Sequence, residues 1–148
     1  MYNIRLATIE ELYQLVELDN IANNTPWSYN DYYTSYLNNN NYIYVIDDGI
    51  NICACCVFGI LVFDAEILQL WVSNRYQNRG LADMLLKNII DVLHKKFLVE
   101  KIFLELHKSN IIARKLYLKN NFNIIANRQN YYNINGILSD CIVMVRKL

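Results

Sequence analysis

An apolar segment, a polar turn and a long amphipathic segment follow one another in the middle of this chain. Residues 67–72 are mostly apolar and predict a strand, and apolar residues recur at helical spacing over 81–97, which predicts a helix. The turn between them carries Gly80 and the small residue Ala82, so backbone N–H groups can approach a bound group with no Cβ in the way. This order of elements constrains the chain to an α/β class of fold.

The same turn predicts an anion site. The start of a helix offers unpaired N–H donors and the positive end of the helix dipole, which suit a phosphate or pyrophosphate group. The side chains of Gln77 and Arg79 would add donors at the rim. An ordinary strand-to-helix turn accounts for these residues equally well, so the turn alone does not decide the function.

Length and charge narrow the class of protein. The chain of 148 residues has the size of one domain, and no linker or repeat divides it, so we expect residues 1–148 to form a single domain. With 14 basic and 14 acidic residues it has no net attraction to nucleic acid. No apolar run reaches the roughly 20 residues of a membrane helix, and the N-terminus lacks the pattern of a signal peptide. We therefore expect a cytoplasmic protein with neither nucleic acid nor a membrane as partner.

The four cysteines do not predict a metal site. Cys53, Cys55, Cys56 and Cys141 lack the paired spacing of zinc ligands, so no metal is expected. On a strand, Cys53 and Cys55 would share one face, which favours small buried side chains in a reducing compartment.

The remaining pattern predicts a mixed α/β domain. Thr8 with Glu11 forms a capping box before a helical stripe, and Ser28 is placed to cap a second helix that runs to about residue 37. Two helices follow, over 81–97 and 110–120. The expected strands are 2–6, 42–46, 52–62, 66–72, 101–106, 122–128 and 141–146.

A carboxylate stands in the middle of the strand over 101–106. Leu104 and Leu106 point to one face of that strand and Glu105 to the other. Burying a carboxylate is costly unless it is paired or its pKa is raised. Glu105 is therefore either a solvated residue on an edge strand or a general base tuned by partial burial.

The helix over 110–120 carries the next candidates. Asn110 is a suitable N-cap, and Asn121 can adopt the left-handed conformation that ends a helix. Tyr117 falls beside the apolar stripe. It is either a core aromatic residue or a proton donor in the cleft between this helix and the preceding strand.

These motifs together resemble a known family. The turn Gln77-x-x-Gly80-x-Ala82 resembles the acyl-CoA pyrophosphate loop of the GNAT superfamily of N-acetyltransferases, (Arg/Gln)-x-x-Gly-x-(Gly/Ala). The chain as a whole is most similar to one branch, the ribosomal-protein-alanine N-acetyltransferases. The motifs shared with that branch are Pro26-Trp27-Ser28, Leu104-Glu105 with Ser109-Asn110, Leu116-Tyr117 with Phe122, Arg128-x-x-Tyr131-Tyr132, and the spacing of Gly136, Asp140 and Met144.

The chain departs from the branch at three places. Leu106-His107 stands where the branch has Val-Arg, Asn121 stands where it commonly has Gly, and Ala82 stands at a Gly position that tolerates Ala. Asn is the least costly replacement for Gly in a left-handed conformation. The change at His107 concerns a substrate contact rather than the chemistry.

The resemblance implies a fold and a set of roles. The fold is a mixed, mostly antiparallel sheet of about seven strands, flanked by about four helices, whose central strands splay apart. Acetyl-CoA is the implied cosubstrate, and no metal is required. The implied roles are proton acceptor for Glu105, proton donor for Tyr117, acetyl-CoA contacts for Leu70, Trp71, Val72, Gln77, Asn78, Arg79, Gly80, Leu81, Ala82 and Asn110, and walls of the peptide side for Trp27 and Tyr131.

Three functions remain open at this point. The first is acetylation of a protein N-terminus, such as the N-terminal alanine of a small-subunit ribosomal protein, by a monomer or weak dimer. The second is acetylation of a small amine such as a polyamine, an aminoglycoside or an amino acid. The third is a non-catalytic module that binds CoA, against which the presence of both Glu105 and Tyr117 argues.

Overall fold

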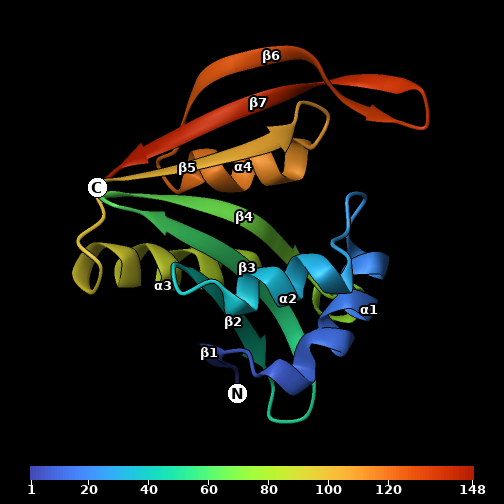
Figure 1. Cartoon of the computed structure of the whole chain (residues 1–148), viewed down its shortest axis with the longest axis vertical. Coiled ribbons are helices and arrows are strands. Elements are labelled where there is room, and N and C mark those ends of the chain that lie inside the picture. The colour runs from blue at the N-terminus through green and yellow to red at the C-terminus, as the bar shows by residue number, and fades with distance from the viewer.

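Seven strands form one mixed sheet in the computed structural model, which describes residues 1–148 (Figure 1). The strand order is β1-β2-β3-β4-β5-β7-β6, and every pairing is antiparallel except that of β4 with β5. The strands are β1 (Asn3–Leu6), β2 (Asn41–Asp47), β3 (Ile52–Leu61), β4 (Asp64–Val72), β5 (Lys101–His107), β6 (Asn123–Ile134) and β7 (Ile137–Lys147).

Helices cover both faces of the sheet, which confirms the predicted class of fold. A larger apolar core of 22 buried residues lies under α3 (Leu81–Lys95) and α4 (Ile111–Lys119). A smaller core of 10 buried residues lies on the opposite face under α1 (Leu12–Ala22) and α2 (Tyr29–Leu37). Two short 3-10 helices, η1 (Ile9–Glu11) and η2 (Asn74–Tyr76), precede α1 and follow β4.

The predicted caps set where the helices begin. The Ser28 hydroxyl accepts from the backbone N–H of Asp31, and the Asp31 carboxylate accepts from the backbone N–H of Ser28. Asn110 caps α4 by accepting from the backbone N–H of Ala113 at 3.1 Å. Asn121 has a φ of 65°, which confirms its left-handed role at the end of that helix.

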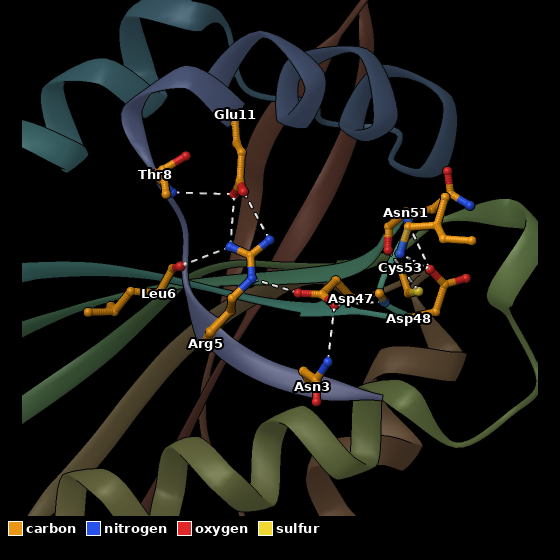
Figure 2. Close-up of polar contacts among 11 residues, drawn as sticks. Asn3, Arg5, Leu6, Thr8, Glu11, Asp47, Asp48, Asn51 and Cys53 are labelled. Atoms are coloured by element: carbon orange, nitrogen blue, oxygen red, sulfur yellow. Dashed lines mark hydrogen bonds and ion pairs between the residues drawn. The ribbon is translucent and has the colours of Figure 1, made fainter. Parts of the chain in front are cut away.

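A charged cluster fastens the first strand to its neighbours (Figure 2). The Arg5 guanidinium donates to both carboxylate oxygens of Glu11, and its Nε donates to Asp47 at 2.6 Å. Asp47 lies on β2 and Glu11 at the end of η1, so one side chain ties three elements together. Hydrogen bonds from the Gly49 backbone and Arg5 hold the pKa of Asp47 below its usual value.

The expectation that Cys53 and Cys55 share a face is wrong. The pairing of β2 with β3 shifts between Ile46 and Asp47, where one extra residue of β3 forms a bulge. Cys53 consequently points into the core under α3, together with Cys56, whereas Cys55 points into the core under α1. All four thiols are buried and free, and burial was predicted for Cys53 and Cys55.

The last two strands are longer than predicted. β6 continues to Ile134 and joins β7 through Asn135 and Gly136, both of which have positive φ. An Asn-Gly pair between paired strands is the signature of a two-residue hairpin turn. The β6–β7 hairpin therefore projects beyond the rest of the sheet (Figure 1).

Candidate active site

The sheet opens where β4 and β5 separate. These parallel strands pair only over the first residues of each, and the last paired residues are Ile67 and Leu104. Beyond that point the strands diverge, with β5 following β7 and β4 following β3 (Figure 1). The predicted splay of the central strands is therefore present.

Two cavities meet in this opening. The first, which we call the loop-side cavity, has a volume of about 370 Å³. The second, the hairpin-side cavity, has a volume of about 360 Å³. Four residues line both cavities, so they border a passage through the sheet: Leu70, Asn110, Ala113 and Tyr117.

The loop-side cavity is built by the predicted anion turn. Gly80 is the N-cap of α3 with a φ of 76°, and an added Cβ would meet no atom within 4 Å. Asn78 also has a positive φ, of 62°. The first N–H groups of α3 have no partner within the helix, so they can bind an anion at this end.

Of the two side chains expected to supply donors at the turn, Gln77 supports the turn and Arg79 faces away from the cavity. Gln77 donates to the backbone carbonyl of Val72 and to Asn74, both at 3.1 Å, which fixes the turn against the end of β4. Arg79 does not line the cavity, contrary to the sequence prediction. Its guanidinium donates to the Tyr2 hydroxyl at 3.3 Å and so faces β1 instead.

One acidic side chain reaches the loop-side cavity, and it is neutralised. Asp83 accepts from Lys87 at 2.7 Å and from the Asn120 amide at 2.9 Å, and Lys119 lies 3.5 Å away. These contacts lower the pKa of Asp83 to about 2, with the hydrogen bond from Lys87 as the largest cause. The cavity therefore carries no uncompensated negative charge that would repel a phosphate.

The edge of β4 presents backbone polar groups to the passage. The N–H of Ser73 donates to the carbonyl of Cys53 on β3, and alternate residues of a strand point their polar groups to opposite sides. The backbone groups of Leu70 and Val72 consequently face the gap rather than β3. The Val72 carbonyl also accepts from Gln77, so an extended ligand arm can pair there with the Leu70 groups and the Val72 N–H.

Tyr117 lies in the passage itself. Its side chain is buried, packs edge-on against Phe122, and lines both cavities. Burial, with a smaller effect of Cys56, raises the pKa of Tyr117 well above its usual value. The hydroxyl is therefore protonated at neutral pH and can act as a donor.

Glu105 lies at the mouth of the hairpin-side cavity. β5 is not an edge strand, because it lies between β4 and β7. The Glu105 side chain is 30% exposed and accepts from Arg128 on β6 at 2.9 Å. Glu105 is thus a paired carboxylate at an opening, rather than one held in an apolar interior. No pattern in the sequence indicates Arg128 as its partner.

A buried polar network holds the wall opposite Glu105. Asp19 on α1 is fully buried and accepts from the Tyr32 hydroxyl at 2.6 Å. That hydroxyl in turn accepts from the indole N–H of Trp71 on β4 at 2.8 Å. Helices α1 and α2 are therefore tied to β4 by hydrogen bonds as well as by apolar contact.

The same carboxylate positions the segment between α1 and α2. Asp19 accepts from the backbone N–H of Trp27 at 3.0 Å and from the Gln69 amide at 3.1 Å. Gln69 also donates to the carbonyl of Thr25 at 3.3 Å. Thr25 and Trp27 both line the hairpin-side cavity, so Asp19 fixes one of its walls. A lone Asp within a helix gave no signal of this role in the sequence.

Most of the predicted site residues meet around the passage. Tyr131 does not line the hairpin-side cavity: the pairing of β6 with β7 shifts between Arg128 and Tyr132, and the Tyr131 residue is 51% exposed. Tyr132 lines the cavity in its place. The predicted residues that line the loop-side cavity are Leu70, Trp71, Val72, Gln77, Asn78, Gly80, Leu81, Ala82, Asn110 and Tyr117, and those that line the hairpin-side cavity include Trp27 and Glu105.

Two further classes of site are not found in residues 1–148. No group of three or more His, Cys, Asp or Glu side chains is placed to hold a metal ion. No helix is long and apolar enough to cross a membrane.

The profile of the Acetyltransferase (GNAT) family matches residues 9–122, which include the whole loop-side cavity. The chain belongs to the GNAT acetyltransferase family. Enzymes of this family take the acetyl group from acetyl-CoA. An open turn at a helix start, a neutralised acidic group and a free strand edge fit that cosubstrate.

Named relatives narrow the class of enzyme to N-acetyltransferases. The [ribosomal protein bS18]-alanine N-acetyltransferase of Haemophilus ducreyi is 33% identical over 127 residues, covering 83% of each chain. The Salmonella typhimurium enzyme of that name is 28% identical over 148 residues, covering 97% of this chain and 96% of its own.

Solved structures agree with this GNAT assignment. The crystal structure of the ribosomal-protein-S18-alanine N-acetyltransferase from Escherichia coli has a TM-score of 0.92 at 25% identity, over 99% of this chain and 94% of that one. Arabidopsis thaliana NAA60 in complex with acetyl-CoA has a TM-score of 0.91 at 15% identity, over 100% of this chain and 99% of that one. The second likeness concerns the fold alone.

Proposed function

We propose that this GNAT enzyme acetylates the N-terminal α-amine of a protein, with the N-terminal alanine of a ribosomal protein as its substrate. The passage through the sheet supports this most directly, because it joins a cavity suited to acetyl-CoA with a second cavity that can admit an amine. The relatives named for ribosomal protein bS18-alanine support the choice of amine. The reaction would take place in the cytoplasm, where ribosomal proteins are made, and the enzyme would act as a monomer or weak dimer.

The cosubstrate would lie in the loop-side cavity. The turn around Gly80 and the start of α3 would hold the pyrophosphate, and the free edge of β4 at Leu70 and Val72 would pair with the pantetheine arm. Asn110 would contact the same arm near the thioester, since it borders the passage.

The chemistry would be direct transfer without an acyl-enzyme. Glu105, directly or through a water molecule, would take a proton from the incoming ammonium group, and the free amine would attack the thioester carbonyl. Backbone N–H groups at the β4 edge would stabilise the oxyanion. As the C–S bond breaks, Tyr117 would protonate the departing CoA thiolate, and the second proton of the attacking nitrogen would pass to the Tyr117 phenolate or to solvent. The buried cysteines are not needed as nucleophiles, since the passage is bordered by none of them.

The pKa of the acceptor amine favours an N-terminus. An α-amine has a pKa of roughly 8, whereas a lysine side chain has a pKa of roughly 10.4, so less basic assistance is needed for the α-amine at pH 7. A carboxylate at an opening, as Glu105 is, suits this modest requirement.

The test compares acceptors. Purified enzyme is given acetyl-CoA and a short peptide with a free N-terminal alanine, the same peptide with a blocked N-terminus, or spermidine. Release of CoA and a mass gain of one acetyl group are expected only with the free peptide. Turnover with spermidine but not with the peptide would favour the small-amine alternative. Absence of turnover with every acceptor would favour a non-catalytic module that binds CoA.

A further inference from the structure

His107 is held in a fixed orientation at the inner end of the β6–β7 hairpin. Its Nδ1 lies 2.9 Å from the Ser139 hydroxyl on β7. Its ring stacks on Tyr132 of β6, with ring centroids 3.7 Å apart and an angle of 16° between the planes. A ring fixed on one edge and one face keeps its second nitrogen in a defined place.

That second nitrogen has no partner. Nε2 of His107 is the one buried side-chain nitrogen or oxygen in residues 1–148 without a hydrogen bond. A buried polar atom left in this state is destabilising, and native proteins retain few of them. A group of this kind beside a cavity is explained when a ligand completes its hydrogen bonding.

The His107 residue lies on the route of the acceptor amine. His107 lines the hairpin-side cavity and also a neighbouring outer cavity of about 820 Å³ bordered by the hairpin tip and the segment after α1. It shares a strand face with Glu105, two residues earlier and about 6.6 Å away along β5. An amine that passes from the outer cavity to Glu105 therefore passes His107.

The protonation state of the ring suits an acceptor. Burial lowers the pKa of His107, so the imidazole is neutral at neutral pH and one ring nitrogen carries a lone pair. When Nδ1–H donates to the Ser139 hydroxyl, the lone pair lies on Nε2.

We propose that His107 is a substrate-binding residue whose Nε2 accepts a hydrogen bond from the α-amine of the acceptor peptide. This assignment rests on the proposed N-terminal acetylation. It places one acceptor on each side of the amine, with Glu105 taking the proton and His107 holding the nitrogen in place.

The kinetic test replaces the ring and keeps its shape. His107→Phe retains a flat ring that can stack on Tyr132 and removes both nitrogens. The KM for the free-alanine peptide should rise on the order of 10- to 100-fold, as expected for a hydrogen bond to a charged group, while the KM for acetyl-CoA stays within twofold. The free energy of unfolding should change by no more than about 1 kcal/mol, because the loss of the hydrogen bond to Ser139 is offset by removal of the unpaired nitrogen. His94→Phe, at the exposed second histidine on α3, is the matched control and should leave both KM values unchanged.

Nitrogen NMR tests the same assignment without turnover. The chain has only two histidines, so ring resonances can be assigned with a His94→Gln variant. In the free enzyme Nε2 of His107 should resonate as an unprotonated nitrogen. Adding the free-alanine peptide in the presence of CoA should shift it, and the His94 resonances should stay in place.

The outcomes separate the two proposals. Wild-type enzyme that acetylates the peptide, with an unchanged peptide KM in His107→Phe or a protonated Nε2, would overturn the role of His107 alone. Wild-type enzyme that fails to acetylate the peptide would overturn the proposed function and the role of His107 with it.

Discussion

Replacing Tyr117 by Phe removes one oxygen from the passage and nothing else. The ring keeps its edge-on contact with Phe122 at a centroid distance of 5.4 Å, and only the hydroxyl oxygen is lost. We therefore expect the free energy of unfolding to change by less than about 1 kcal/mol. For a chain of this size that corresponds to a melting temperature within about 4 °C of the wild type.

The effect on turnover should be much larger. Loss of a positioned proton donor lowers kcat by a factor on the order of 10² to 10⁴. At about 1.36 kcal/mol per tenfold change, the activation barrier would rise by about 2.7 to 5.4 kcal/mol. Burial keeps this phenol protonated, so a proton is present beside the thiolate when it leaves.

The assay follows release of CoA from acetyl-CoA with the free-alanine peptide as acceptor. Acetyl-CoA affinity is measured separately by calorimetry and should be unchanged in Tyr117→Phe. Tyr44→Phe is a matched control, because Tyr44 is a partly buried aromatic packed against Phe58 and lines neither cavity. A Tyr117→Phe enzyme with wild-type kcat and wild-type melting temperature would show that the thiolate leaves unaided. Tyr117 would then be a core aromatic residue.

Three other changes test separate parts of the account. Gly80→Glu should abolish the thermal shift caused by acetyl-CoA while the free protein still melts cooperatively. Gly49→Glu, at another glycine of positive φ, should keep the shift. A full shift in Gly80→Glu would show that the cosubstrate binds elsewhere. Glu105→Gln should bind acetyl-CoA normally, and its kcat near pH 7 should fall at least about 10²-fold. The loss in kcat should shrink as rising pH deprotonates the amine. A loss independent of pH would make Glu105 a positioning residue. Asp19→Ala leaves three donors without their acceptor. It should lower the free energy of unfolding by about 3 to 5 kcal/mol in a denaturant titration. A change smaller than about 1 kcal/mol would contradict a stabilising role of the Asp19 network.

Local signals in the sequence predicted most of the fold. Ser28 and Asn110 cap helices because their side chains satisfy backbone donors only a few residues away, which spacing alone reveals. Asn121 adopts its left-handed conformation for an equally local reason. The Asn135-Gly136 pair is an equally local signal, because it is typical of a hairpin turn. The full length of β6 and β7 could therefore also have been predicted from the sequence.

The features that sequence analysis missed depend on distant residues. The bulge that turns Cys53 to the other face arises from the pairing of β3 with β2, which no local pattern specifies. Arg128 on β6 donates to Glu105 on β5, and these two residues lie 23 positions apart in the sequence. Asp19 meets Gln69 over 50 residues, and a helix pattern gives no warning that its polar side chain is buried.

The proposed reaction is transfer of an acetyl group to the α-amine of an N-terminal alanine. Purified enzyme, acetyl-CoA and the ribosomal-protein peptide with a free N-terminal alanine are combined, and the product is fragmented in a mass spectrometer. We expect one added acetyl group, located on the first residue. Acetylation confined to a lysine side chain, or none above the level of enzyme-free controls, would contradict it.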